Sequence, residues 1–284
     1  MTREEAYDRC RAIARAEARN FYYGFVLLAP ERRAGIYAAY AFSRRADDSV
    51  DEGGSDERRT AAVAALRRDL DACVAGTPPP GDPVLVALAD TIDRFRIPRA
   101  HLDALIDGVE MDIAVRRYAD FPALKGYCDR VAGAVGLVSL HIFGFRDPSA
   151  PGHAADLGVA LQIVNIMRDV AEDVARDRIY LPADEMAAHG VTEADLRAGR
   201  ATPGFRALMA DQGARAREYF RGGERLLPLL DRRSRMCVAM LAGLYQEILS
   251  EIERRDHDVF AGRVALSAPR KLRLMAVRTA GALR

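Results

Sequence analysis

Apolar residues recur along this chain at intervals of three and four positions, the spacing by which a helix buries one face. Alanine, leucine, arginine and glutamate, which favour helices, fill most of the intervals. The pattern predicts no strand. It predicts helices near residues 3–18, 31–52, 57–75, 84–95, 99–116, 120–144, 152–176, 203–222, 233–255 and 270–282.

Proline and glycine mark the breaks between these helices. The clearest breaks lie at Pro30, Gly53 with Gly54, and the TPPPG stretch at residues 77–81. None is long enough to link two separate domains. We therefore expect one all-α domain over residues 1–284, built as a single helical bundle.

Two of the predicted helices carry a stripe of polar residues that includes two aspartates four positions apart. The stripes are Tyr40, Arg44, Asp47 and Asp51 in the first, and Gln162, Asn165, Asp169 and Asp173 in the second. Steps of three and four residues place each stripe on one helix face, where like charges repel. Both stripes lie in otherwise apolar stretches, so we expect a cation between the two pairs.

Magnesium is the cation that these ligands favour. It binds a few carboxylates together with substrate phosphate oxygens, whereas zinc sites usually contain histidine or cysteine. Nearby arginines can bind the same phosphate with two hydrogen bonds each. They are Arg44, Arg45, Arg168 and Arg176. One such aspartate pair alone is more often a solvated face, but two pairs in matched apolar settings favour a metal site.

Charge and cysteine content argue against other classes of protein. The 42 basic and 41 acidic residues nearly balance, which is unlike a nucleic-acid-binding surface. The four cysteines have no CxxC spacing, so we predict neither a zinc site nor a disulfide framework. Free cysteines favour a reducing, cytoplasmic setting. We see no signal peptide and no run of about 18 apolar residues that would span a membrane. The five histidines lie apart from the polar stripes, and we assign them no chemistry.

Three segments resemble a known family. They are residues 127–136 (YCDRVAGAVG), 161–173 (LQIVNIMRDVAED) and 178–182 (RIYLP). Together with the N-terminal Asn20-Phe21-Tyr22 and the C-terminal residues 258–264, they resemble the squalene/phytoene synthase family over almost the whole chain. The resemblance implies an isoprenoid (prenyl) synthase fold. It also implies an enzyme that joins two allylic prenyl diphosphates head to head, by way of a cyclopropylcarbinyl diphosphate.

The resemblance also implies roles for individual residues. It makes Asp47 and Asp51 one magnesium-binding pair and Asp169 and Asp173 the other, with Asn165 as a further ligand. The remaining residues expected at the diphosphates are Asn20, Arg44, Gln162, Arg168 and Arg263. Tyr40 and Tyr245 are expected to shelter an allylic cation with their rings, although each could equally be an ordinary core aromatic.

The chain departs from the family pattern at two places. Many members carry serines where this chain has Ala18 and Asn20, so a hydroxyl group is missing there. Arg130 stands just before Val-Ala-Gly, where some members have tyrosine, which puts a phenol role at that position in doubt. Three further acids are either hydrogen-bond partners that hold the ligating residues in place or simply charged neighbours. They are Asp48, Asp112 and Glu172.

The substrate stays open at this point. The Asn20-Phe21 motif favours farnesyl diphosphate, which would give presqualene diphosphate or squalene, over two geranylgeranyl diphosphates, which would give phytoene. Squalene formation would require NADPH, and squalene-type members bind it without the GxGxxG motif that this chain lacks after a strand. A head-to-tail prenyltransferase, a terpene cyclase or a non-catalytic prenyl-lipid binding protein are the alternatives of other classes. The Val-Ala-Gly and RIYLP segments argue against the first two classes. A binding protein would keep its function without metal, so magnesium dependence of the function distinguishes the third class from an enzyme.

The segment at residues 269–278 is basic and amphipathic. It is either a capping helix or a peripheral contact with the anionic inner face of a membrane. We predict no obligate protein partner.

Overall fold

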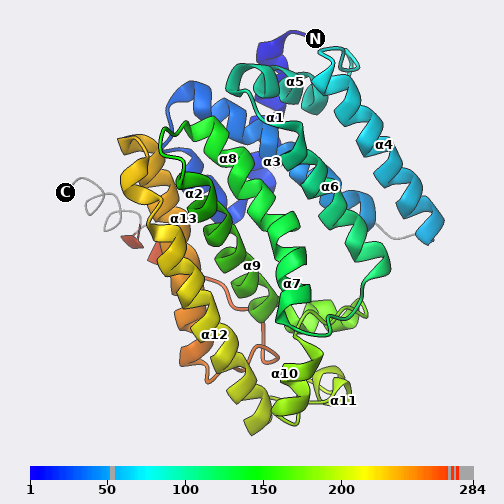
Figure 1. Ribbon diagram of the computed structural model, residues 1–284, viewed down its shortest axis with the longest axis vertical. Coiled ribbons are helices and arrows are strands. Elements are labelled where there is room, and N and C mark those ends of the chain that lie inside the picture. Colours follow the sequence, from blue (N-terminus) through cyan, green and yellow to red (C-terminus); the bar gives the residue numbers. More distant parts are fainter. Residues whose placement is uncertain (52–54, 268–269, 272, 275–284) are drawn as a thin grey trace.

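A computed structural model describes residues 1–51, 55–267, 270–271 and 273–274, without the side chains of Arg19, Asn20 and Asp51. Within these residues the chain is helical and has no strand, only a bridge between Arg117 and Ile179. The predicted all-α class is confirmed (Figure 1).

The helices follow one another with short connections. In chain order they are α1 (Arg3–Glu17), α2 (Arg19–Phe25), α3 (Pro30–Asp51), α4 (Asp56–Val74), α5 (Pro83–Phe95), α6 (Arg99–Ala114), α7 (Phe121–Cys128), the π-helical turn η1 (Asp129–Gly133), α8 (Ala134–Phe143), α9 (Ala150–Ala175), α10 (Ala183–Ala188), α11 (Glu193–Arg197), α12 (Pro203–Glu224), the 3₁₀ turn η2 (Leu227–Leu229) and α13 (Arg232–Arg254).

The predicted helices agree with this order except in a few segments. The expected helix at 120–144 is interrupted by η1, because five residues there form a π turn between α7 and α8. A π turn is a single wider turn between two α-helical segments, and the short apolar pattern on either side still reads as one helix. The short helices α2, α10 and α11 were not predicted. The expected helix at 270–282 lies mostly outside the described residues.

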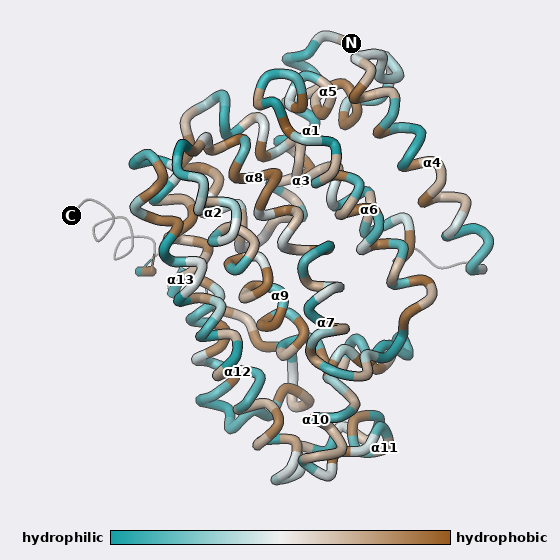
Figure 2. Tube along the Cα trace, viewed as in Figure 1, coloured by the Kyte–Doolittle hydropathy of each residue, from teal (hydrophilic) through white to brown (hydrophobic). Residues whose placement is uncertain are grey.

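The two helices with acidic stripes, α3 and α9, both pack against α8. Helix α9 lies in the middle of the molecule and contacts η1, α8, α12 and α13, while α3 contacts α1, α4, α5, α6 and α8 (Figure 1). Figure 2 shows hydrophilic stretches along the outer helices α4 and α12 and more hydrophobic ones where α8 and α9 face the interior. Helix α8 therefore forms the wall that the two acidic helices share.

Glycines bring α9 into backbone contact with η1 and α8, which follow each other without a break. A Cβ atom on Gly158 would lie 2.4 Å from the carbonyl oxygen of Ala132, and one on Gly136 would lie 2.6 Å from that of Ala154. Both distances are far below van der Waals contact. The pairs also show that the two helices run antiparallel, because moving four residues forward on one moves four residues back on the other.

The described part of the basic C-terminal segment packs against α13 and α2. Arg270 pairs with Glu247 and Glu251, and the Lys271 ammonium lies 5.7 Å from the centre of the Tyr23 ring. Contact with a membrane stays a prediction. Among the described residues, no helix has the length and hydrophobicity needed to span a bilayer.

We predict that Gly158→Ala destabilises the protein by about 1–3 kcal/mol, because the added methyl group would overlap a backbone carbonyl that cannot swing aside. Urea denaturation followed by circular dichroism measures the change. Gly152→Ala on the same helix is the matched control, since a Cβ there meets no described atom within 4 Å. It should be neutral or stabilising by up to about 1 kcal/mol. Equal loss of stability in both variants would contradict the close crossing.

Candidate active site

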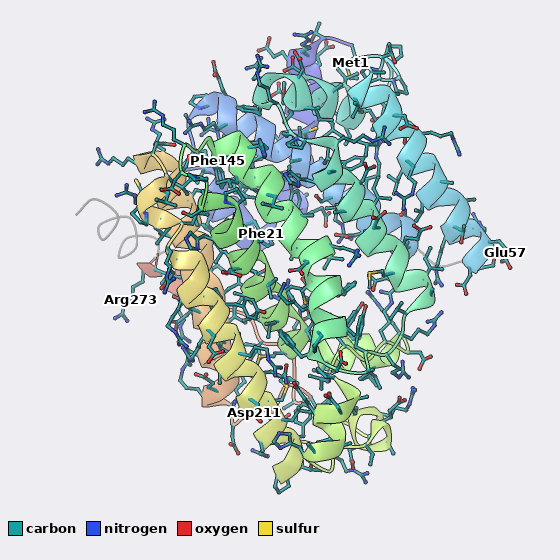
Figure 3. All side chains as sticks on the ribbon, in the orientation of Figure 1. Met1, Phe21, Glu57, Phe145, Asp211 and Arg273 are labelled. Carbon is teal, nitrogen blue, oxygen red and sulfur yellow. The ribbon has the colours of Figure 1, made fainter. Side chains whose placement is uncertain are left out.

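A cavity of about 280 Å³ lies between the helices, and Asp47, Gln162 and Asn165 contribute polar groups to its lining. Most other lining side chains are apolar and come from α2, α3, α6, α8, α9 and α13. Phe21, one of them, lies near the centre of the molecule in Figure 3. The cavity therefore combines an apolar interior with polar groups from both predicted stripes.

The first stripe, on α3, has Asp47 at the cavity. Arg44 forms an ion pair of 2.6 Å with Asp48, one helical turn on, so Asp48 holds the guanidinium of Arg44 beside the stripe. The side chain of Asp51 lies outside the described residues, as does that of Asn20.

Arg45 does not face the diphosphate site as expected. Its guanidinium makes hydrogen bonds of 2.8 and 2.9 Å to the two carboxylate oxygens of Asp82, which also accepts the backbone N–H groups at the start of α5. The expectation for Arg45 is wrong, because Asp82 offers a bidentate partner on the other side of α3. Arg176 ends α9 in an exposed position.

On α9, the amides of Gln162 and Asn165 line the cavity. The Asn165 Nδ2 atom lies 3.3 Å from Gln162 Oε1, to which it donates. The Asn165 Oδ1 atom is buried and has no hydrogen-bond partner among the residues that the structure describes. A buried oxygen without a donor is unfavourable unless a ligand, ion or water binds it.

The carboxylate of Asp169 lies between two arginines. Arg168 Nε donates to it over 2.8 Å, and a second hydrogen bond comes from the same guanidinium. Arg263 Nη2 lies 3.2 Å from Asp169 Oδ1, and Arg263 Nη1 lies 3.5 Å from Glu172. The structure thus brings Arg168 and Arg263 together at Asp169, and Glu172 is a partner of Arg263.

Asp173 is in a different electrostatic environment. Burial, together with repulsion by Asp169, raises the pKa of the Asp173 carboxyl group to about 7, although Arg178 acts against the shift. The charged form is therefore disfavoured in the protein as it stands. A bound cation would reverse this by stabilising the carboxylate.

Aromatic rings surround the polar end of the cavity. The Phe21 ring centre lies 5.6 Å from that of Tyr245 and 6.4 Å from that of Tyr40, and Tyr40 lies 6.0 Å from Phe25. Tyr40 lines the cavity, whereas Tyr245, which is 2% exposed, packs behind Phe21. Burial raises the pKa of Tyr40 to about 12 and also raises that of Tyr245, so both phenols are neutral at physiological pH.

Comparison with known proteins shows which family shares this arrangement. The squalene/phytoene synthase family model matches residues 14–270. The chain belongs to the squalene/phytoene synthase family. The phytoene synthase of Mycobacterium tuberculosis is 40% identical over 99% of this chain and 92% of that protein. The 15-cis-phytoene synthase of Synechococcus elongatus is 39% identical over 94% of this chain and 90% of that protein.

Solved structures of the squalene/phytoene synthase family agree. A dehydrosqualene synthase in complex with a ligand has a TM-score of 0.92 and 29% identity, covering 98% of this chain and 97% of that one. The squalene synthase HpnC from Alicyclobacillus acidocaldarius has a TM-score of 0.83 and 31% identity, covering 90% and 96%. The predicted isoprenoid synthase fold and the predicted prenyltransferase class are confirmed. The family is one of head-to-head condensation of prenyl diphosphates.

Magnesium, expected for this squalene/phytoene synthase, fits the donor set of the site. The unpartnered Asn165 oxygen and the disfavoured charge of Asp173 both call for a cation. Within the described part of the chain, no three histidine, cysteine, aspartate or glutamate side chains come close enough to hold a metal by themselves.

A buried polar network beside the second stripe was not predicted. The Asp112 carboxylate accepts hydrogen bonds from the hydroxyls of Tyr127 and Tyr180 over 3.0 and 2.7 Å. Arg178, which is 9% exposed, lies near Asp173 and donates to the backbone carbonyl of Asp112 over 3.4 Å. The RIYLP segment was a signal for Arg178 and Tyr180, but their partner on α6 lies 68 residues from Tyr180. Arg130 donates to Gly126 O from an exposed position on η1.

We predict that Tyr180→Phe lowers the free energy of unfolding by about 1–2 kcal/mol, because Asp112 loses the hydrogen bond from the buried Tyr180 hydroxyl. Thermal and urea unfolding measure it. Tyr118→Phe is the matched control: the Tyr118 ring stacks on Tyr180 at 5.7 Å, but its buried hydroxyl has no partner among the described residues. That variant should be neutral or stabilising. A larger loss in Tyr118→Phe than in Tyr180→Phe would refute this account of the network.

Removal of one acid from either stripe should abolish metal-assisted binding. We expect Asp47→Asn and Asp169→Asn each to lower kcat/KM by about a hundredfold or more, since the developing charge on the diphosphate loses its counter-charge. The same variants should lose the rise in melting temperature that magnesium and inorganic pyrophosphate produce together in the unaltered protein. Asp211→Asn, far from the site in Figure 3, should behave as the unaltered protein does. Retained stabilisation by magnesium in both stripe variants would exclude these residues as ligands.

Proposed function

We propose that this protein is a phytoene synthase that condenses two molecules of geranylgeranyl diphosphate with the help of magnesium. The observation that carries the proposal is the similarity to proteins named phytoene synthase, at 37–40% identity over 94–99% of the chain. The structural neighbours named for dehydrosqualene or squalene are less similar in sequence, at 29% and 31%. The expectation of farnesyl diphosphate is therefore the weaker reading, and its twenty-carbon alternative is the one we propose.

The reaction begins with departure of one diphosphate from an allylic carbon. In this proposal the guanidinium groups of Arg168 and Arg263, which meet at Asp169, stabilise that leaving group. Arg44, which pairs with Asp48 beside the first stripe, acts with them. Magnesium bound by Asp47, Asp51, Asn165, Asp169 and Asp173 would supply further positive charge to the departing diphosphate.

The allylic cation that remains is attacked by the double bond of the second substrate. Loss of a proton then closes the cyclopropane ring of the cyclopropylcarbinyl diphosphate. The rings of Phe21, Phe25 and Tyr40 line the cavity and present π faces that favour a cation without forming a bond to it. Because burial keeps the Tyr40 phenol neutral, it does not trap the cation as a phenolate would. The apolar walls exclude the water that would otherwise capture it.

The second half of the reaction determines the need for a reductant. The cyclopropylcarbinyl intermediate loses its diphosphate, and the rearranged cation forms phytoene when it loses a proton. No hydride is consumed, so NADPH is not required. Squalene formation would instead reduce that cation with a hydride from NADPH.

We expect the purified protein with magnesium to convert geranylgeranyl diphosphate to phytoene without NADPH, as seen by mass analysis of extracted products. Farnesyl diphosphate should react at least about tenfold more slowly in kcat/KM, because the shorter chain leaves part of the apolar cavity unfilled. Each substrate should be tested with and without NADPH, and with magnesium removed by a chelator as the control. Dehydrosqualene or squalene as the main product, with little phytoene, would overturn the proposal.

A further inference from the structure

Helix α8 presents a row of side chains to the cavity, one on each successive turn. Val135, Ser139 and Phe143 are four residues apart and all line the cavity. Ser139 is much smaller than either neighbour. The wall formed by α8 is therefore recessed at Ser139, between a valine nearer the acidic stripes and a phenylalanine farther away.

The packing of α8 against α9 gives the distance of Ser139 from Asn165, which lies at the polar end of the cavity. Ala132 is opposite Gly158, and Gly136 is opposite Ala154. Continuing the antiparallel alignment by three residues places Ser139 level with Pro151, near the start of α9. Asn165, at the polar end, is fourteen residues farther along α9, which corresponds to about 21 Å at the helical rise per residue. Ala154 is eleven residues from Asn165, or about 16 Å.

Two other walls of the cavity end at a smaller depth, whereas α6 brings Leu102 to the cavity near the far end of α8, where His101 packs on His141. On α3, Ile36 lies eleven residues before Asp47, which is again about 16 Å. A Cβ on Gly223 would lie 2.7 Å from Leu157, so Leu226, three residues on and also lining the cavity, comes level with Ala154. Beyond about 16 Å, the cavity therefore continues between α8 and α6.

These depths match the lengths of the two candidate substrates. Each five-carbon unit adds four chain bonds, which is about 5 Å when extended. A fifteen-carbon chain thus reaches about 15 Å, level with Gly136 and Ala154, and a twenty-carbon chain reaches about 20 Å, level with Ser139.

We propose that Ser139 is a specificity-determining residue that leaves room for the fourth five-carbon unit, while Phe143 closes the cavity one turn farther on. This inference rests on the proposed function, since it assumes a twenty-carbon substrate. The serine acts by its small volume: a larger apolar side chain at this position fills the recess and excludes the end of the longer chain without touching the diphosphate site.

The test compares Ser139→Leu with the unaltered protein on geranylgeranyl and farnesyl diphosphates, with kcat/KM measured for each substrate. The ratio of the twenty-carbon to the fifteen-carbon value should fall at least tenfold in Ser139→Leu, through loss of the twenty-carbon reaction. Ser139→Ala, which keeps the recess, should change the ratio less than threefold. His141→Leu makes a comparable change on the same helix at a residue that packs on His101 and Phe145, and it should leave the ratio unchanged.

The outcomes separate the two proposals. If the unaltered protein makes phytoene and Ser139→Leu keeps the same substrate ratio, the inference about Ser139 is wrong and the proposed function stands. Equal loss of both reactions in a folded Ser139→Leu protein also overturns it, because a specificity role predicts selective loss. If the unaltered protein uses only farnesyl diphosphate, both proposals fail together. Should Ser139→Leu not fold, as judged by circular dichroism, Ser139→Val gives the same test with a smaller added volume.

Discussion

The contact between the backbones of α8 and α9 is the constraint on which the rest of this structure depends. Gly136 lets α8 approach the carbonyl group of Ala154 on α9, and Gly158 lets α9 approach that of Ala132 on η1, just before α8. A side chain larger than hydrogen at either position would overlap these carbonyl groups. This contact fixes the register of the two helices. It thereby sets the distance from the amides and acids of α9 to the side chains of α8 at the far end of the cavity.

The charges of the second stripe are arranged unequally. Asp169 lies between Arg168 and Arg263, so its carboxylate is already compensated. The charged form of Asp173, four residues on, is less stable than that of an exposed aspartate, because burial and the charge of Asp169 both raise its pKa. The Asn165 oxygen is likewise without a donor among the described residues. The oxygen of Asn165 and the carboxyl group of Asp173 are therefore the groups on which we propose a magnesium diphosphate, a ligand that brings positive and negative charge together.

Apolar and aromatic groups account for the other half of the chemistry. The proposed reaction needs a surface that stabilises an allylic cation without reacting with it, and we propose the rings of Tyr40, Phe21 and Phe25, which line the cavity, as that surface. The same residues exclude water. The network of Asp112, Tyr127 and Tyr180 lies behind the second stripe and gives the chain segment after α9 a fixed place against α6.

The sequence by itself determined the helical class, the two polar stripes and the family. These are local or motif-level properties: a period of 3.6 residues places side chains on a face whatever the helix later packs against. Only the tertiary structure decided which partners those side chains meet. Arg45 binds Asp82, and Tyr245 packs behind Phe21, because these contacts join residues far apart in the chain. The depth of the cavity at Ser139 is also a tertiary property. It follows from how two helices pack, and the spacing of residues within either helix does not predict it.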